Sequence, residues 1–301
     1  MTHAEQTQNP APPEHDEPIL RIRSQRKRLL RTFLRNRAAV FGLILVVIIV
    51  TLAAAAPLVT ARDPLEQNAR MRMQPPDGAY LLGHDTFGRD VYARIVYAGR
   101  VSLIVGVVSV LLGGAAGTIL GLMAGYAGGK TETVIMRFVD ILMAFPSLLL
   151  GLTVLAVLGA GIGKMIIAIG LMLSPSFARI VHGAALTIKH NDYVEAARSI
   201  GSSNFRIIRS HVLPNLMGEV VVLGSLLTAS AIRVEANLSF IGLGVSPPTP
   251  TWGNMIRDGV PNLINAPWLS IFPGLAILIT VLAFNLLGDG LRDVLDPKLQ
   301  E

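Results

Sequence analysis

Long apolar runs constrain this sequence most strongly, because their lengths match the thickness of a membrane. A helix needs about 20 predominantly apolar residues to cross the hydrocarbon core of a bilayer. The first run, residues 38–59, contains no charged side chain. Six membrane-spanning helices are predicted, over residues 38–59, 101–127, 134–158, 162–185, 216–238 and 269–287.

Composition supports the same class of protein. Hydrophobic residues make up 51% of the chain and charged residues 15%, and the mean hydropathy of +0.55 excludes an ordinary water-soluble domain. The lack of cysteine excludes a disulfide framework and thiolate metal ligands. The net charge of +6 does not indicate a nucleic-acid partner, because the basic residues cluster beside the apolar runs. We therefore expect an all-α integral membrane protein that contacts the lipid bilayer and binds no nucleic acid.

Lysine and arginine residues orient the predicted helices, because cytoplasmic segments are enriched in them. One basic group precedes the first helix, and a second lies in or beside the segment between the fourth and fifth helices. These residues are Arg21, Arg23, Arg26, Lys27, Arg28, Arg31, Arg35 and Arg37 in the first group, and Arg179, Lys189, Arg198, Arg206 and Arg209 in the second. Both segments are predicted to be cytoplasmic, and six spans place both termini there. Six arginines in the first outer segment make this bias imperfect.

The predicted spans divide the chain into four parts. They are a disordered, basic cytoplasmic tail (residues 1–30), a first helix with an outer segment (31–100), a core transmembrane domain (101–291) and a cytoplasmic C-terminal tail (292–301). The core contains a cytoplasmic loop at residues 186–215. The first helix is expected to be retained, because it is too long for a signal peptide and no small-residue cleavage site follows it.

The second predicted helix carries glycine at every fourth position, Gly113, Gly117, Gly121 and Gly125. Such a seam lets the backbone of a neighbouring helix approach closely. Small-residue seams occur in many helical membrane bundles, so this one predicts tight packing and no particular activity.

Residues 124–131, AGYAGGKT, come close to the phosphate-binding pattern G-x-x-x-x-G-K-[ST]. That pattern forms a phosphate loop only between a strand and a helix of a soluble α/β unit. Here it follows a predicted membrane helix, and alanine replaces its first glycine. We expect no nucleotide site in this chain, so any ATP that drives it must bind another subunit.

Ionisable residues inside the predicted spans are candidates for the transport pathway or for structural ion pairs, because burying a charge in a membrane is costly. Arg137 and Asp140 lie three residues apart in the third span, where they can pair locally. Glu219 begins the fifth span. Arg233 and Glu235, near the outer end of the fifth span, are two residues apart and point in different directions, so they need separate partners.

The cytoplasmic segment 191–215, NDYVEAARSIGSSNFRIIRSHVLPN, predicts two short helices joined by a tight turn. Gly201 can end the first helix in a left-handed conformation. Ser203 or Asn204 can cap the second, which is expected to stop before Pro214. Such an elbow, held at the membrane surface by the flanking spans, is a preformed element that a soluble partner can grip.

The elbow resembles the EAA motif of ABC importer permeases. The matching residues are Glu195, Ala196, Ala197, Gly201, Leu213 and Pro214. His211 replaces the isoleucine of the general motif, as it does in the peptide-transporter branch, and is not taken as evidence for a metal. The resemblance implies that the elbow docks into a cleft of a cytoplasmic ATPase and transmits its closure to the spans.

Three further segments resemble the dipeptide and oligopeptide permeases, which also include nickel transporters. These are residues 81–106, 237–256 and 288–298, and the resemblance extends from about residue 31 to 297. The chain is similar to the C-type subunit of those systems, with a type I importer fold. The outer-loop motif carried by the first segment includes Gly83, Asp85, Gly88, Arg89 and Asp90.

The resemblance also implies a mechanism and a set of partners. It predicts a heterodimer with a homologous second permease, two cytoplasmic ATPase subunits that bind ATP and magnesium, and an extracytoplasmic substrate-binding protein. The permease, in the bacterial cytoplasmic membrane, would alternate access and would itself hold no cofactor, metal or catalytic residue.

Two alternatives remain at this stage. A self-contained secondary transporter would use intramembrane charges for ion coupling, but it explains the helices and leaves the elbow unexplained. Within the ABC family, the substrate stays open among dipeptides, oligopeptides, glutathione and nickel complexes. His84 and Asp85 invite a nickel hypothesis, although the outer-loop motif that contains them favours a structural role.

Overall fold

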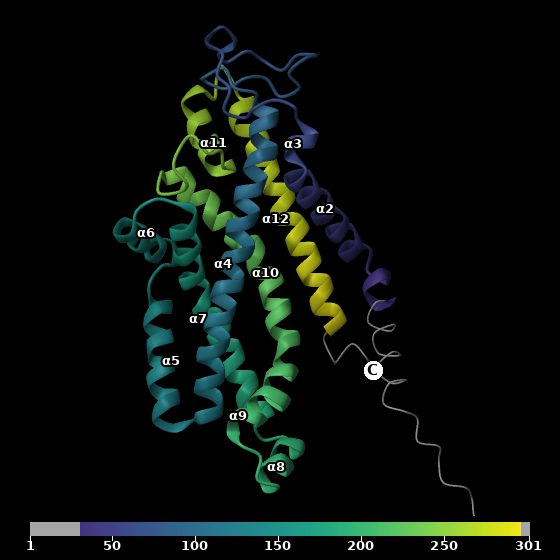
Figure 1. Ribbon diagram of the computed structural model, residues 1–301, viewed down its shortest axis with the longest axis vertical. Helices are drawn as coiled ribbons and strands as arrows, with labels where there is room; N and C mark the ends of the chain where they lie inside the picture. Colours follow the sequence, from purple (N-terminus) through teal and green to yellow (C-terminus); the bar gives the residue numbers. More distant parts are fainter. Residues whose placement is uncertain (1–30, 296–301) are drawn as a thin grey trace, which may run out of the picture.

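The computed structural model describes residues 31–295, which are almost entirely helical and contain no β-strand (Figure 1). The predicted tail at residues 1–30 and the end of the predicted C-terminal tail lie outside the described residues. The longer helices are α2 (Arg37–Ala54), α4 (Val91–Ala127), α5 (Gly129–Ala144), α6 (Ser147–Leu158), α7 (Ile162–Ile188), α10 (Leu213–Ile241) and α12 (Trp268–Leu295). The shorter elements are α3 (Ala56–Val59), η1 (Ala69–Met71), α8 (Asp192–Ser199), α9 (Asn204–Ile207), η2 (Ile208–Val212), α11 (Trp252–Gly259) and η3 (Val260–Asn262).

The third predicted span is broken. In its place α5 and α6 meet at an angle of 94°, while five other helical segments are long and apolar enough to cross a membrane unbroken. The break falls at Phe145 and Pro146, where the residue before proline is biased towards an extended conformation and Phe145 adopts one. The third of the six predicted spans is therefore a bent pair of helices, and the count is six if that pair crosses as one span.

The second helix begins well before its apolar run. α4 starts at Val91 rather than at residue 101, because the Asp90 carboxylate accepts hydrogen bonds from the backbone N–H groups of Tyr92 and Ala93 and so caps the helix there. The last helix is also longer than predicted and reaches Leu295. The polar ends of both helices extend beyond the apolar stretch by which the sequence locates a span.

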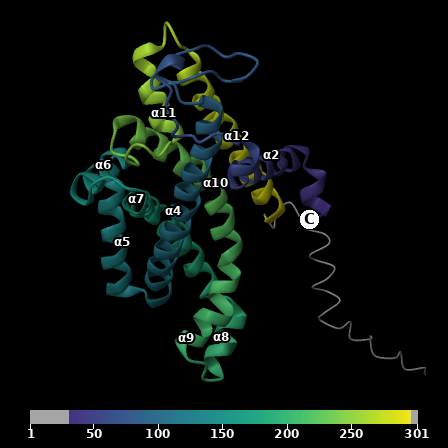
Figure 2. The same ribbon diagram turned by 45° about the horizontal axis from the view of Figure 1, so that its top comes forward.

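The glycine seam of α4 lies against α7, which confirms its interpretation as a packing surface. A Cβ atom added at Gly113 or Gly121 would lie 2.5 Å from a backbone oxygen of α7. Only the absence of side chains permits this separation of the two helices. On the other side of α4, the helices α10 and α12 follow, and α2 packs against the outer face of α12 (Figures 1 and 2).

Both ends of the described part of the chain point towards the end of the molecule that carries the elbow, but they stop short of it (Figure 1). The start of α2 is tied to the end of α12, because the Asn36 side-chain amide donates to a carboxylate oxygen of Asp293 at 2.9 Å. The segment between α3 and α4 covers the opposite end together with α11 (Figures 1 and 2).

The AGYAGGKT segment forms the turn between α4 and α5. Gly128 and Gly129 have φ angles of +69° and +56°, which glycine adopts without strain. A 37-residue helix precedes this turn, so the strand that a phosphate loop requires is not there.

Candidate functional site

The first half of the elbow is an α-helix ended by glycine, as predicted. In α8 the carbonyl of Arg198 accepts the N–H of Gly201 at 3.0 Å, and the carbonyl of Ala197 accepts the N–H of Ser202 at 3.1 Å. These two bonds form a Schellman motif, which requires a left-handed residue at its centre. Gly201 has a φ of +82°, so its predicted conformation is confirmed.

The second half of the elbow continues directly into the fifth span. Ser203 caps α9, since its hydroxyl oxygen accepts the N–H of Arg206 at 3.4 Å, and η2 and α10 follow without interruption. The expectation that this helix stops before Pro214 is wrong. η2 is a π-helical turn in which the N–H of Leu213 donates to the carbonyl of Ile208. We attribute the passage of the helix to this wider turn, which relieves the clash of the Pro214 ring with the preceding turn.

The buried side of the elbow is part of a core at the inner ends of the spans. Val194 and Ala197 of α8 and Ile207 of α9 are buried together with Leu122 of α4 and Val181 of α7. Because this core is closely packed, the elbow and the inner ends of α4 and α7 move together rather than independently. A displacement of the elbow is therefore a displacement of these helix ends.

The other side of the elbow is exposed and mixes charge with apolar surface. Glu195 and Ala196 are exposed, whereas Ala197 belongs to the core. Ile200 and Phe205 flank the turn and are 83% and 73% exposed. Large apolar side chains with this exposure mark a contact surface when they cluster beside charged groups. Ile200 and Phe205 were not among the residues predicted for the elbow's contact surface. A single apolar residue in an amphipathic segment does not indicate the face of the helix on which it lies.

The predicted coupling residue His211 has a structural place in the elbow. Its ring lies 6.2 Å from the ring of Tyr193, centroid to centroid. The Asn215 side-chain amide donates to the Tyr193 hydroxyl oxygen at 3.2 Å and to the His211 carbonyl oxygen at 2.6 Å. Leu213 and Pro214 form the first turn of α10, so all the predicted elbow residues lie in one continuous region.

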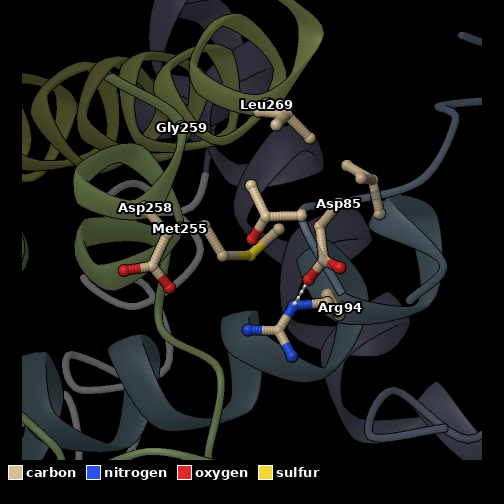
Figure 3. Close-up of a pocket in the computed structure, with 8 residues that line it drawn as sticks. Asp85, Arg94, Met255, Asp258, Gly259 and Leu269 are labelled. Atoms are coloured by element: carbon tan, nitrogen blue, oxygen red, sulfur yellow. Dashed lines mark ion pairs between the residues drawn. The ribbon is translucent and has the colours of Figure 1, made fainter. Parts of the chain in front are cut away.

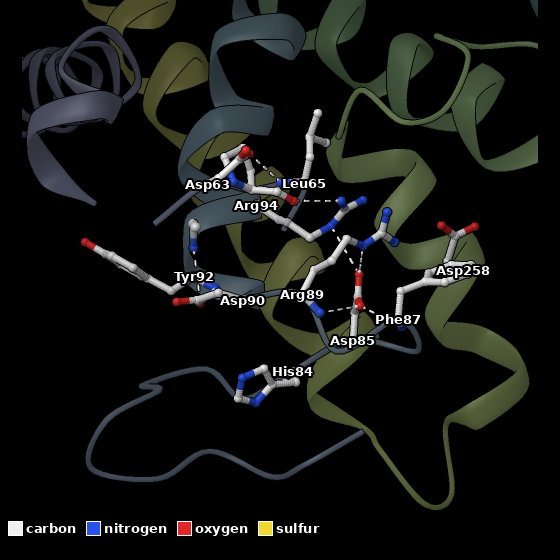
Figure 4. Close-up of polar contacts among 12 residues, drawn as sticks. Asp63, Leu65, His84, Asp85, Phe87, Arg89, Asp90, Tyr92, Arg94 and Asp258 are labelled. Carbon is white, nitrogen blue, oxygen red and sulfur yellow. Dashed lines mark hydrogen bonds and ion pairs between the residues drawn. The ribbon is translucent and has the colours of Figure 1, made fainter. Parts of the chain in front are cut away.

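The outer-loop motif builds an ion-pair cluster (Figure 4). Asp85 is its centre: one carboxylate oxygen accepts Nε of Arg89 at 2.6 Å and lies 3.4 Å from Nε of Arg94. The other oxygen accepts the N–H groups of Phe87 and Arg89 at 2.8 and 3.0 Å. The three charged side chains are 4–12% exposed, so the pairing compensates for the loss of water around them. We call Asp85, Arg89 and Arg94 the outer cluster.

Asp90 joins the same segment to the start of α4. Besides capping α4, its carboxylate accepts Nη1 of Arg62 at 2.7 Å, and this hydrogen bond raises the pKa of the Arg62 guanidinium. Gly83 and Gly88 both have positive φ angles, +72° and +73°. A side chain at Gly88 would also overlap the carbonyl group of Asn68. The whole motif therefore shapes the turn that leads into α4.

His84 is buried inside this turn. Its ring lies 4.0 Å from the Tyr80 ring, centroid to centroid, in a tilted arrangement, and the Arg62 guanidinium lies 3.8 Å from the centre of the Tyr80 ring. The Asp85 carboxylate already pairs with Arg89 and Arg94. Within residues 31–295 no group of three or more potential metal ligands occurs.

A small cavity separates the outer cluster from α11 and α12 (Figure 3). Asp85 and Arg94 line one wall, and Met255, Asp258 and Leu269 line the other. Its volume is about 10 Å³, room for a single water molecule at most. The outer cluster is therefore a structural tie between the outer segment and α4, and this cavity cannot hold a peptide.

The charges of the third span pair across helices rather than locally. Asp140 accepts Nη2 of Arg179 on α7 at 2.9 Å, so the expected Arg137–Asp140 pair is wrong. Arg137 is exposed and makes no ion pair within the described residues. A second contact between the same helices joins Glu132 to Nε2 of His182 at 2.8 Å. Antiparallel α5 and α7 thus share two polar contacts, and the cross-helix partners were missed because they lie far apart in sequence.

Arg233 and Glu235 point in different directions, as predicted. Arg233 is exposed and reaches only Ser230 at 3.3 Å, whereas Glu235 is fully buried. The two carboxyl oxygens of Glu235 accept the hydroxyl groups of Ser102 on α4 at 2.9 Å and Ser239 on α10 at 2.7 Å. The alternative of a structural ion pair is wrong for Glu235, because its partners are hydroxyl groups. This contact fixes α10 to α4 near their outer ends.

A helical membrane domain that packs a capped elbow into the inner ends of its spans has the architecture of a transporter permease. The chain belongs to the family of inner membrane components of binding-protein-dependent transport systems, whose model matches residues 117–301. A model of the N-terminal transmembrane domain of oligopeptide transport permease C matches residues 24–76. The chain is therefore a multi-pass protein of the bacterial inner membrane and an importer permease, and ATP hydrolysis belongs to separate subunits.

Curated relatives match nearly the whole chain. The glutathione transport system permease protein GsiD of Pectobacterium atrosepticum is 42% identical, over 94% of this chain and 95% of that protein. The di/tripeptide transport system permease protein DppC of Pseudomonas aeruginosa is 40% identical, over 94% of this chain and 96% of that protein. The dipeptide transport system permease protein DppC of Alkalihalophilus pseudofirmus is 41% identical, over 88% of each chain.

A solved structure supports the fold. A chain of the MetNI methionine ABC transporter, in a structure of inward-facing conformations, superposes with a TM-score of 0.54. The match covers 66% of this chain and 95% of that chain at 20% identity. The fold is that of a type I importer permease. Because the chain belongs to this family, the alternative of a self-contained secondary transporter is excluded.

Proposed function

We propose that the chain is the C-type permease subunit of an ATP-driven importer of short peptides. Relatives whose names specify dipeptides, di- and tripeptides or glutathione cover nearly the whole chain at 40–42% identity. Glutathione is itself a small modified tripeptide, so one class of substrate accounts for all of these names. The nickel alternative has no comparable support among them.

The elbow is the observation that carries the proposal. The face of the elbow that points away from the core exposes Glu195, Ile200 and Phe205, and the opposite face is part of the core shared with α4 and α7. A soluble subunit that grips the exposed face would therefore move the inner ends of these spans. Two ATPase subunits, with ATP and magnesium bound to them and not to this chain, would provide the movement.

The complete importer would contain a second, homologous permease and an extracytoplasmic binding protein. The two permeases would enclose the pathway, and the binding protein would deliver the peptide to the end of the molecule that carries the outer cluster. Nucleotide binding would then shift an equilibrium between inward-open and outward-open arrangements, because the ATPase pair contacts the two arrangements differently.

Reconstitution tests this proposal. The chain is assembled in proteoliposomes with its paired permease, both ATPases and the binding protein, and uptake of a labelled dipeptide is measured with ATP and with a non-hydrolysable analogue. We expect uptake with ATP only, and none when the second permease is omitted. ATP-dependent uptake of a nickel complex with no uptake of dipeptide or glutathione would contradict the proposed substrate class, and uptake by the chain alone would contradict the mechanism.

A further inference from the structure

Two charged residues at the inner ends of the spans have no partner in the described part of the chain. Glu219 lies on α10 and Arg292 on α12, and both are exposed. Neither side chain makes a hydrogen bond or an ion pair with residues 31–295, whereas Asp140 and Glu235 inside the spans do. Asp289 on α12 is also exposed and without a side-chain partner among these residues, but it does not line the cavity that Glu219 and Arg292 share. An ionisable group in a span that no protein group compensates is a candidate for contact with a transported molecule.

The same two residues face one cavity. It has a volume of about 540 Å³ and is formed by α7, α10 and α12. α12 packs against α10 at Gly288, whose Cα lies close to Leu226, and beyond this contact the inner part of α10 continues away from the end of α12 (Figure 1). The lining is apolar except for Asn215, Glu219 and Arg292. A cavity of this size is within the range of small-molecule sites, about 300–1,000 Å³.

Both charges lie far along their helices from the outer ends. At 1.5 Å per residue, Glu219 is about 33 Å along α10 from the outer end of that helix, and Arg292 is about 36 Å along α12 from the outer end of that helix. The cavity that they share also includes Asn215, in the first turn of α10 beside the elbow. A molecule leaving the pathway at the elbow end of the spans would pass this cavity.

We propose that Glu219 and Arg292 form an exit subsite that binds the two charged ends of a short peptide. This inference rests on the proposed function. At neutral pH a short peptide carries an α-ammonium group and an α-carboxylate. The carboxylate of Glu219 matches the first and the guanidinium of Arg292 matches the second. The apolar lining accepts the varied side chains between them, so the subsite would select for charged termini and not for sequence.

Three other cavities fit an exit role less well. A cavity of about 580 Å³ is lined by Arg62 and Asp63, but it lies beside the outer segment, at the end of the molecule opposite the elbow (Figure 1). The cavity beside the outer cluster has room for one water molecule at most, as described above. A larger groove between α4 and α10 holds about 530 Å³, but its lining includes no charged residue. This groove therefore has no charged group that could recognise the termini of a peptide. It could equally pack against an apolar surface, such as that of a second permease.

Gly218 provides a position at which the subsite can be probed. A Cβ atom there has no neighbour within 4 Å, and Gly218 lines the cavity next to Glu219. The chain has no native cysteine, so Gly218→Cys adds a single thiol without steric conflict. The complex is assembled in nanodiscs with cysteine-free partner subunits, so that reagents reach both faces.

Three activated disulfides of alanyl-cysteine are compared as probes: the free dipeptide, its N-acetyl form and its C-terminal amide. Methyl methanethiosulfonate, which is small and neutral, reports thiol reactivity and access. We expect Glu219→Gln to slow labelling by the free dipeptide about two- to fivefold, the effect of losing one ion pair at a hydrated boundary. Labelling by the N-acetyl form and by the neutral reagent should not change. Arg292→Gln should slow labelling by the free dipeptide and not by the amide.

Two results would overturn the subsite. Equal effects of the glutamine variants on all probes would show that the charges do not recognise peptide termini. Protection of the Gly218→Cys thiol from every reagent in the assembled complex, but not in the isolated chain, would show that another subunit covers the cavity. Dipeptide uptake by the wild-type complex is measured in parallel. Uptake without charge-selective labelling refutes the subsite alone, whereas absence of uptake refutes the proposed function.

Discussion

Replacing Gly201 by valine should uncouple ATP hydrolysis from transport while leaving the membrane domain assembled. Gly201 holds a φ of +82° in the turn of the elbow, and a Cβ atom there would meet nothing within 4 Å. The penalty is therefore one of backbone conformation and not of collision. For a residue with a side chain the left-handed conformation costs roughly 1–2 kcal/mol, and for a β-branched one it is a rare outlier.

This strain would weaken the two hydrogen bonds that end α8, because both form around a left-handed residue at position 201. A free energy of about 1–2 kcal/mol lowers the population of the native turn about 5- to 30-fold relative to its alternatives. Transport per ATP hydrolysed should fall by a similar factor, because a rearranged elbow no longer presents the contact surface. Gly201→Asn is the matched control, since asparagine tolerates the left-handed region far better than valine does.

The assay compares peptide uptake, stimulated ATPase activity and assembly yield in the reconstituted complex. We expect normal assembly for both variants, reduced coupling for Gly201→Val and near-normal coupling for Gly201→Asn. If the valine variant couples normally, or if both variants fail equally, the left-handed turn is not what the elbow requires and the reasoning is refuted.

Three further predictions address topology, the ATPase contact and the outer cluster. Single cysteines placed at Ser203 and at Asp77 should react with an impermeant reagent from opposite sides of the membrane, and labelling of both on intact cells would contradict the orientation. Glu195→Ala should weaken ATPase recruitment to vesicles that contain both permeases without changing binding-protein docking; unchanged recruitment would reduce Glu195 to a helix-dipole contribution of about 0.3–1 kcal/mol. Asp85→Ala should destabilise the outer segment by about 3–5 kcal/mol, because Arg89 and Arg94 lose a buried partner, which limited proteolysis and thermal melting would detect as early loss of that segment.

The sequence predicts the spans well where an apolar run coincides with a helix. It fails where the backbone geometry at a proline decides whether the helix continues or breaks. Pro146 breaks the third run, yet Pro175 and Pro273 lie inside unbroken helices. Hydropathy cannot distinguish these cases, because the outcome depends on how neighbouring helices support the freed carbonyl groups. The early start of α4 was missed for a different reason, since Arg94 and Arg100 interrupt the apolar run in its first turns and the cap at Asp90 fixes where the helix begins.

Local and distant interactions explain which parts of the candidate site could be predicted. The turn at Gly201 and the cap of α9 depend on residues within a few positions, so the sequence predicted the turn and narrowed the cap to Ser203 or Asn204, of which the structure has Ser203. Asp140 pairs with Arg179, a partner 39 positions away, in preference to its local neighbour. The outer cluster was recognised only in part, because Arg94 belongs to it through the fold and the family motif gave no reason to include it.

The π-helical turn at η2 joins the second half of the elbow to the fifth span in one continuous helical segment. The helical segment runs without a break from Asn204 to Ile241, 38 residues or about 57 Å. A tilt of only about 5° at its inner end would shift the far end by about 5 Å, from the same rise per residue. Glu235 sits near that far end with its hydroxyl partner on α4. A partner that moves the elbow would therefore also move the outer end of α10 when the segment tilts as one body. No relay of separate contacts across the membrane would be needed.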